Sequence, residues 1–242
     1  MRKTIPLMVL GALVLSALAC GGGTTTGGTT GSGDTGGGTT GSGDTGGGDT
    51  GGSGSDALFT DDFSDSSAGW DEDSSDSSTV EYRSGKYVIG ITVESWLAWA
   101  NPSPKDFENI HLEVTAGNTG DAQDAGFGLI CNYTDDGDFY YLAMSVDGFY
   151  IIAKKEGDST EALSDADNQW LASEDIAVNQ TSYLIGADCA DGTLTLYVDG
   201  TQIASVEDDT FTSGSVGLIA ATFDGSDSAE VTFDNYEVTQ LN

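Results

Sequence analysis

Residues 126–154 read GFGLICNYTDDGDFYYLAMSVDGFYIIAK, and this stretch decides the fold. It contains three apolar runs of strand length that are rich in Ile, Leu, Phe and Tyr, and most of these residue types favour β-strands. Asp-Gly pairs at 136–137 and 147–148 separate the three runs. Because Asp and Gly tolerate the positive φ that tight hairpin turns require, the stretch predicts three consecutive antiparallel strands.

The same pattern of short apolar runs continues over the chain from residue 57 onward. Further Asp-Gly pairs lie at 191–192, 199–200 and 224–225, and no long helical period interrupts the pattern. Many short strands with turn residues between them predict an all-β sandwich or barrel. The least regular part, 162–177, is expected to be a loop or one short helical turn. The expected strands cover 86–93, 110–116, 126–133, 139–146, 149–155, 183–189, 193–198, 202–206, 215–222 and 230–239.

Two more segments join the opening stretch in a resemblance to a known family. Residues 192–220 read GTLTLYVDGTQIASVEDDTFTSGSVGLIA, and residues 231–238 read VTFDNYEV. In this order the three segments resemble the concanavalin A-like lectin/glucanase superfamily, and within it the bacterial branch described as family 16 glycoside hydrolase-like or 3-keto-disaccharide hydrolase-like. The resemblance covers nearly all of 58–240. It implies a jelly-roll sandwich of two packed antiparallel sheets, one of them curved.

The N-terminus has the layout of a bacterial lipoprotein signal peptide. Two basic residues precede an almost wholly apolar run over 5–19, which is too short to span a bilayer comfortably. The run ends in ALAC, which resembles a lipobox, so we expect residues 1–19 to be removed and Cys20 to be lipidated. Gly21 stands where an inner-membrane retention signal places Asp, which favours anchoring to the outer membrane or cell surface. An ordinary secretory signal with an incidental cysteine is the alternative.

A low-complexity segment follows, in which residues 20–56 are almost entirely Gly, Thr, Ser and Asp. The decapeptide TTGSGDTGGG occurs at 29–38 and again, unchanged, at 39–48. Because such a segment has no apolar side chains to bury, it is expected to be a disordered linker, with a reach of roughly 30–35 Å. The composition changes sharply at Ala57, so 57–242 is expected to form a single domain.

The chain is strongly acidic. It has 40 Asp and Glu against 7 Lys and Arg, for a formal net charge of −33. A field of this sign repels nucleic acid and anionic lipid, so neither is expected as a partner. Contact with a membrane is therefore expected only through the lipid on Cys20.

Two cysteines, Cys131 and Cys189, lie in expected strands. Related domains of the branch carry one cysteine in each of these two segments, and exported proteins form disulfides. We expect a disulfide between neighbouring strands, with two buried free thiols as the alternative. Metal binding by the pair is not expected, because His111 is the only histidine and no Cys-x-x-Cys spacing occurs.

The sequence lacks the catalytic motifs that this fold would lead one to look for. Family 16 glycoside hydrolases carry Glu-x-Asp-x-x-Glu on one strand, which supplies the two carboxyl groups of a retaining mechanism. The nearest segment here, 232–237, reads TFDNYE, with Thr232 in the place of the nucleophile. His111 is not accompanied by a Gly-x-Ser-x-Gly elbow, so a structural role is expected for it.

Aromatic side chains favour a binding module, because lectin-like sheets hold sugars by stacking aromatic rings on them. Trp170 is expected to be the most exposed ring, since it lies in the irregular stretch. Trp96 and Trp99 are an odd number of residues apart and should point to opposite faces of a strand; Trp99 matches a family tryptophan that we read as structural. For each ring, burial in the core is the alternative. The candidate platforms are Trp96, Tyr140, Tyr150 and Trp170.

Two aspartates are candidate ligands for a structural calcium ion. Asp62 lies near the start of the domain and Asp234 near its end, and the first and last strands of such sandwiches are often adjacent. Calcium binds several oxygen ligands at once, which these carboxylates and nearby carbonyls would provide. The alternative is that both residues cap turns and face solvent.

Taken together, these patterns predict a surface-displayed, non-catalytic jelly-roll domain that binds an extracellular carbohydrate or another polymer. Two alternatives stay open. One is a glycoside hydrolase acting on an extracellular saccharide, and the other is a structural or adhesive surface protein without a small ligand.

Overall fold

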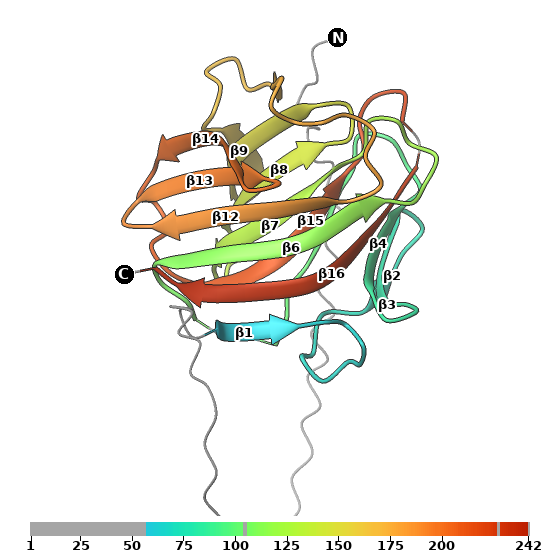
Figure 1. Ribbon diagram of the computed structural model, residues 1–242, viewed down its shortest axis with the longest axis horizontal. Helices are drawn as coiled ribbons and strands as arrows, with labels where there is room; N and C mark the ends of the chain where they lie inside the picture. Colours follow the sequence, from blue (N-terminus) through green and yellow to red (C-terminus); the bar gives the residue numbers. More distant parts are fainter. Residues whose placement is uncertain (1–56, 104–105, 227, 242) are drawn as a thin grey trace, which may run out of the picture. The chain divides into compact units, whose positions relative to one another are not determined.

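The computed structural model describes residues 57–103, 106–226 and 228–241 (Figure 1). The expected signal peptide, Cys20 and the linker lie outside these residues. In the described part, sixteen strands form two antiparallel sheets, and no helix there is long and apolar enough to cross a membrane.

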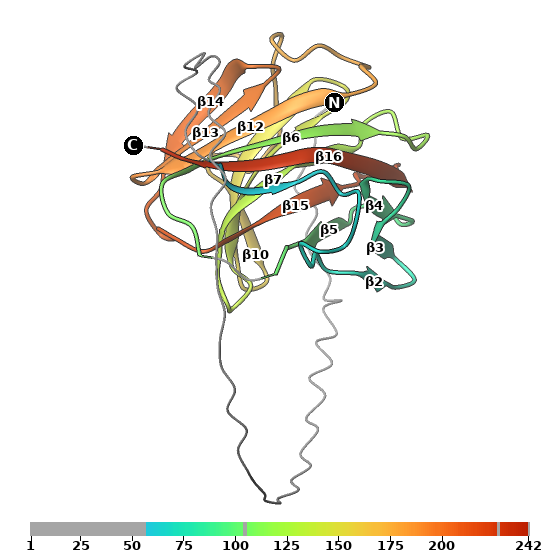
Figure 2. The same ribbon diagram turned by 60° about the horizontal axis from the view of Figure 1, so that its bottom comes forward.

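The larger sheet has nine strands, all antiparallel to their neighbours. Strand β1 (Ala57–Asp61) pairs with the C-terminal part of the last strand of the fold, and Figures 1 and 2 show the two lying side by side. The start and the end of the domain are therefore held together in one sheet. The remaining strands run, in spatial order, β14 (Thr201–Glu207), β13 (Thr193–Val198), β12 (Tyr183–Ala190), β6 (Ile110–Asn118), β16 (Ala229–Gln240), β4 (Tyr87–Ile91), β3 (Ser78–Tyr82) and β2 (Asp73–Ser74).

The smaller sheet has seven strands and is also antiparallel. The two-residue strand β11 (Leu171–Ala172) pairs with one of its members. It lies within the stretch expected to be irregular, which contains no helical turn but returns briefly to the sheet. The main strands run, in spatial order, β10 (Ser159–Ala162), β9 (Phe149–Glu156), β8 (Phe139–Ser145), β7 (Gly126–Tyr133), β15 (Ser215–Ala221) and β5 (Leu97–Ala100).

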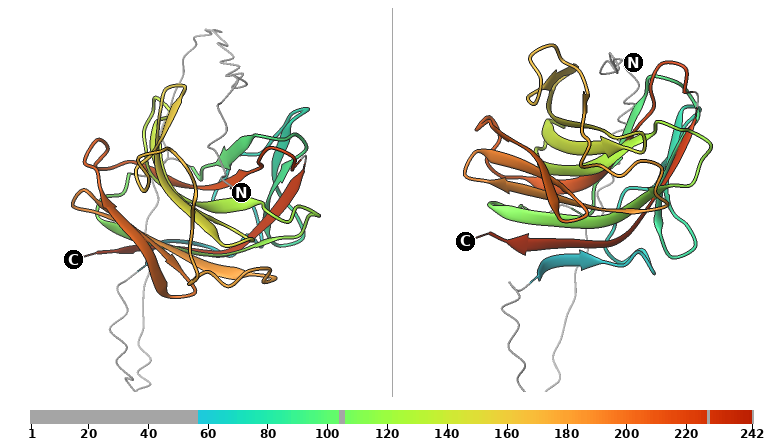
Figure 3. Two further views of the ribbon diagram at one scale, coloured as in Figure 1. Left: turned by 90° about the horizontal axis from the view of Figure 1, so that it is seen from above. Right: turned by 45° about the horizontal axis from the view of Figure 1, so that its top comes forward.

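The two sheets pack face to face around a continuous apolar core, and both are curved (Figure 3). Strand β6 shows the alternation that this packing requires, because Ile110, Leu112 and Val114 are fully buried while the residues between them are partly exposed. The prediction of an all-β jelly-roll sandwich is confirmed.

Two of the Asp-Gly pairs close two-residue hairpins, as the sequence predicted. Between β12 and β13, Asp191 and Gly192 have φ values of 49° and 74°. Between β13 and β14, Asp199 and Gly200 have φ values of 50° and 76°. Positive φ at both central residues matches the twist of the flanking strands, which is why these two residue types occur there.

Three strands in the middle of the smaller sheet depart from simple alternation. Nearly all residues of β7, β8 and β15 are buried, so both faces of these strands are covered. Their near-continuous apolar sequences agree with this arrangement. One face belongs to the core, and the other carries the candidate site.

Candidate functional site

The seven-stranded sheet has an apolar outer face, by which we mean the face turned away from the larger sheet. Side chains that alternate with core residues along the strands gather there into a second cluster, separate from the core. The partly buried rings of Trp99, Tyr133 and Phe149 pack against it. The buried members are Leu97, Ile130, Phe139, Tyr141, Ala143, Ile151, Ala153, Ala162, Trp170, Ile219, Ala221 and Phe223.

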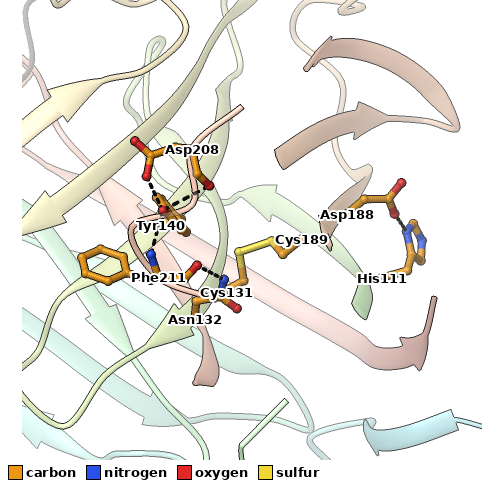
Figure 4. Close-up of a disulfide and its surroundings, with 8 residues drawn as sticks. All are labelled: His111, Cys131, Asn132, Tyr140, Asp188, Cys189, Asp208 and Phe211. Carbon is orange, nitrogen blue, oxygen red and sulfur yellow. Dashed lines mark hydrogen bonds and ion pairs between the residues drawn. A yellow bond between two sulfur atoms is a disulfide. The ribbon is translucent and has the colours of Figure 1, made fainter. Parts of the chain in front are cut away.

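A β-bulge in β7 places Tyr133 on this outer face. Asn132 has a φ of 52°, and the register between β7 and β15 shifts at this point. The extra residue breaks the strict alternation of the strand. Asn132 Nδ2 donates a hydrogen bond of 2.7 Å to the carbonyl oxygen of Phe211, which holds the bulge in place (Figure 4). The Tyr133 ring consequently stacks on Phe139, with centroids 5.5 Å apart and planes 18° apart.

Four side chains from different strands meet beside this bulge, and we call Trp99, Tyr133, Phe139 and Lys155 the Trp99 patch. The Trp99 and Phe139 ring centroids are 5.4 Å apart. Lys155 Nζ lies 5.5 Å from the Trp99 centroid and 5.6 Å from the Phe139 centroid. Trp99 on β5 and Lys155 on β9 are separated by three strands, so their long side chains lean across the face to meet. Gly128 lies in the same cross-strand row as Trp99, at a position where a Cβ atom would come within 3 Å of Leu142 and Ala143.

Within the patch, Trp99 and Tyr133 are the partly exposed rings. Burial raises the pKa of the Tyr133 hydroxyl, and the negative charges of Asp71 and Asp138 also raise it. The hydrogen bond with Trp99 lowers this pKa, but by less than burial raises it. The phenol is therefore neutral at ordinary pH and can both donate and accept hydrogen bonds. An aromatic surface edged by such polar groups is suited to a ligand that has apolar faces and hydroxyl groups.

Trp96 and Trp99 lie on opposite faces of the sheet, as predicted. Trp96 packs against the core between the sheets, and its ring N–H is buried without a hydrogen-bond partner among the described residues. Tyr150 also packs against that core and stays partly exposed. Neither ring contributes to the Trp99 patch.

Two of the four expected platforms are buried, which corrects the sequence-based assignment. The alternation of β8 points Tyr140 into the core, where it is fully buried and donates a hydrogen bond to the Asp208 carboxylate (Figure 4). Burial and the hydrogen bond to Asp208 raise the pKa of Tyr140 to about 12. Trp170, expected to be the most exposed ring, is only 4% exposed. Strand β11 directly follows Trp170, and its pairing with β9 places the Trp170 indole on the outer face. There the indole meets the Phe223 ring edge-on, with centroids 5.2 Å apart.

The two strand cysteines form a disulfide, which confirms the predicted pairing of Cys131 with Cys189 (Figure 4). The expectation that the bridge joins neighbouring strands is wrong. Cys131 lies on β7 and Cys189 on β12, which belong to different sheets, and their Cα atoms are 6.6 Å apart. Both side chains point into the core, so the bond ties one sheet to the other.

The two candidate calcium ligands have protein partners of their own. Asp62 accepts a hydrogen bond of 3.0 Å from the backbone N–H of Ser64, so it caps its own turn. Asp234 forms an ion pair of 2.6 Å with Lys86 Nζ. No cluster of three or more His, Cys, Asp and Glu that could hold a metal occurs in residues 57–103, 106–226 and 228–241. Calcium binding by Asp62 and Asp234 stays a prediction.

His111 lies on the outer face of the larger sheet, whereas the Trp99 patch lies on the smaller sheet. His111 and Asp188 lie directly opposite each other in the β6–β12 pairing. The Nδ1 atom of His111 is 2.5 Å from Asp188 Oδ1. Tyr197 donates a second hydrogen bond of 2.8 Å to Asp188. The hydrogen bond to Asp188 raises the pKa of His111 above its ordinary value, although burial lowers it.

Replacing His111 with glutamine is expected to reduce the pH dependence of stability. Because the pKa of His111 is raised in the folded protein, protonation of His111 stabilises the fold. This stabilisation is complete at pH values below 6.5, the ordinary histidine pKa, and is lost as the pH rises through the folded-state pKa. For a partly exposed pair the effect is on the order of 1 kcal/mol. Urea unfolding of the wild type and of His111→Gln between pH 5 and pH 9 would measure it. Parallel pH profiles for the two proteins would contradict the expectation.

Among the described residues, the strands of the smaller sheet place no carboxylate on its outer face. Retaining glycosidases need two carboxyl groups about 5 Å apart. In the described strands of this sheet, every outward position is apolar, small, hydroxylated or basic. The central positions are Gly126, Gly128 and Ile130 of β7, Phe139, Tyr141 and Ala143 of β8, and Ile151, Ala153 and Lys155 of β9.

The chain is similar to proteins of known structure, although no sequence comparison finds a relative. No family profile matches the chain, and no curated protein sequence matches it. The chain is similar to a Bacillus licheniformis β-glucanase, with a TM-score of 0.53, 10% identity and coverage of 76% of this chain and 98% of that one. It is also similar to a prokaryotic β-1,3-1,4-glucanase from a mouse hindgut metagenome, with a TM-score of 0.54, 10% identity and coverage of 76% and 99%. A third similar structure is a Bacillus subtilis protein of unknown function with a galectin-like fold, with a TM-score of 0.53, 13% identity and coverage of 76% and 96%.

At these identities the likeness shows the fold alone. It agrees with the resemblance of residues 126–154, 192–220 and 231–238, and with the two curved antiparallel sheets of the structure. The domain has the concanavalin A-like lectin/glucanase jelly-roll fold.

Proposed function

We propose that this domain is a saccharide-binding module that holds its ligand on the Trp99 patch. The observation that carries the proposal is the meeting of two partly exposed rings, Trp99 and Tyr133, on the outer face of the smaller sheet. Sugars offer apolar ring faces that stack on aromatic rings, and hydroxyl groups that bond to polar neighbours. Two of the structures with this fold are glucanases by name, which makes a saccharide the natural class of ligand to test.

Binding is favoured over hydrolysis by the composition of the same face. Its central strand positions carry glycine, alanine, apolar side chains and one lysine, and the chain lacks the Glu-x-Asp-x-x-Glu motif. A ligand seated on this face would meet rings and one ammonium group, and no paired strand carboxylates to cleave it.

The binding test uses the purified chain without residues 1–20 and a panel of immobilised polysaccharides. We expect retention on at least one saccharide, with no release of reducing ends during prolonged incubation. Failure to bind any saccharide would overturn the proposal. Cleavage of a retained saccharide would replace the binding module with a hydrolase.

We further propose that the domain is displayed as a lipoprotein, anchored by Cys20 at the outer membrane or cell surface and spaced by the linker. In a bacterial host, the full chain is expected to incorporate labelled fatty acid and to partition with membranes. Cys20→Ser is expected to abolish both, because the thiol accepts the lipid. Ser32→Ala in the linker is the matched control and should behave as the wild type. Labelling that persists in Cys20→Ser would contradict the proposal.

A further inference from the structure

Lys155 is an unusual basic residue within the patch. It lies at an outward position of β9 and is only 8% exposed. Its ammonium group donates hydrogen bonds to the carbonyl oxygens of Gly157, at 2.7 Å, and Gly137, at 3.3 Å. It also lies over the rings of Trp99 and Phe139. The charge is therefore buried against carbonyl dipoles and ring faces.

The other described Lys and Arg side chains form ion pairs. Arg83 pairs with Glu230 at 2.6 Å, Lys86 with Asp234 at 2.6 Å, and Lys154 with Asp208 at 3.1 Å. Across the described residues, Lys155 has no such pair, although the chain contains 40 Asp and Glu. A buried charge is unfavourable unless it is compensated, so the missing carboxylate calls for a physical explanation.

The neighbouring acidic groups do not supply the missing partner. Asp138 Oδ1 accepts a hydrogen bond of 2.7 Å from the N–H of Gly157, and Asp71 Oδ2 accepts one of 3.1 Å from the N–H of Asn101. An ammonium group has three N–H donors, and two carbonyls occupy two of them. The carbonyl dipoles and ring faces compensate the charge in part, but no described carboxylate neutralises it. One N–H donor and an unneutralised charge are therefore left for a ligand.

We propose that the ligand of the Trp99 patch is an anionic saccharide whose carboxylate or sulfate pairs with Lys155 while a sugar ring stacks on Trp99 or Tyr133. This inference rests on the proposed function and narrows its ligand class. The net charge of −33 repels anions at long range, so recognition depends on close contact with the patch. At physiological ionic strength the repulsion is screened beyond about 8 Å, which leaves this local contact to decide affinity.

The test compares acidic polymers with their neutral counterparts, at physiological ionic strength. Polygalacturonate and its methyl ester form the carboxylate arm, and dextran sulfate and dextran form the sulfate arm. The wild type is expected to bind at least one acidic polymer about tenfold more tightly than its neutral counterpart, as a charge-assisted hydrogen bond would give. The arm in which the preference appears identifies the anionic group.

Variants separate charge recognition from a purely structural role of Lys155. Lys155→Met is expected to lose the preference for the acidic polymer while it keeps its affinity for the neutral one, and Lys155→Arg to keep the preference. Lys154→Met, which alters the adjacent ion-paired lysine, is the matched control and should keep the preference. An equal loss of both affinities in Lys155→Met, together with a lower melting temperature, would assign the residue to holding the two turns and overturn the inference.

Different results would overturn the anionic ligand and the saccharide-binding function. Equal binding of acidic and neutral polymers by the wild type would overturn the anionic ligand and leave the saccharide-binding function standing. No binding to any polymer here or in the wider panel would overturn both.

Discussion

Replacing Trp99 with alanine is expected to lower the affinity for the bound saccharide about 30-fold, since a central aromatic contact contributes roughly 2 kcal/mol. Trp99 is a partly exposed ring that touches Phe139 and approaches Lys155, so its loss removes both the stacking surface and the packing that positions its neighbours. Calorimetric titration of the wild type and Trp99→Ala with a polysaccharide retained in the panel would measure the change.

Two controls accompany this experiment, one at the other sheet and one at Trp99 itself. Tyr197 is another partly exposed aromatic residue, on the outer face of the larger sheet, so Tyr197→Ala should bind as the wild type does. Trp99→Phe keeps an aromatic face and should lose less affinity than Trp99→Ala. Thermal melting of each variant checks that it is folded. Affinity within about threefold of the wild type in a folded Trp99→Ala would remove the patch as the binding site.

The fold was predictable because its signals are local. Asp191-Gly192 and Asp199-Gly200 each specify a reversal within two residues and have the positive φ values that such turns need, while in the pairs at 136–137, 147–148 and 224–225 only the glycine has a positive φ. Alternation along β6 specifies which face is buried, and the burial pattern of that strand follows it. Neither signal depends on contacts between distant parts of the chain.

The site was less predictable because it depends on departures from these local rules. Counting residues from Cys131 places Tyr133 on the core side, and only the bulge at Asn132 moves it to the outer face. The near-continuous apolar sequence of β7 and β8 was the available signal, since it indicates strands covered on both faces. The odd spacing placed Trp96 and Trp99 on opposite faces without showing which ring was outward, and Trp99 was read as structural.

The position of Trp170 and the strands joined by the disulfide were also not predictable, because both depend on contacts between distant segments of the chain. The two residues of β11 bring Trp170 back to the sheet, which no local pattern in the irregular stretch indicates. Cys131 and Cys189 were paired correctly, but sequence order does not show which sheet holds each strand. Both features depend on how the two sheets are assembled.

Removing the disulfide is expected to destabilise the domain by about 4 kcal/mol. The bond closes a loop with a sequence separation of 58 residues, and its loss frees that loop in the unfolded state. For a domain of this size the change corresponds to a fall in melting temperature of about 8–16 °C. Calorimetry of Cys131→Ala/Cys189→Ala against the wild type would measure it.

The same variant should also weaken saccharide binding, because the bond lies next to the bulge that presents Tyr133. Cys131 directly precedes Asn132, whose hydrogen bond to Phe211 holds the bulge, and the disulfide fixes this part of β7 to the opposite sheet. Reductant should bring the wild type to the melting temperature of the double variant and leave the variant unchanged. A double variant that melts within about 2 °C of the wild type would show that core packing alone holds the sheets together. If it instead melts early but binds normally at low temperature, the bulge is held by the Asn132 hydrogen bond without help from the disulfide.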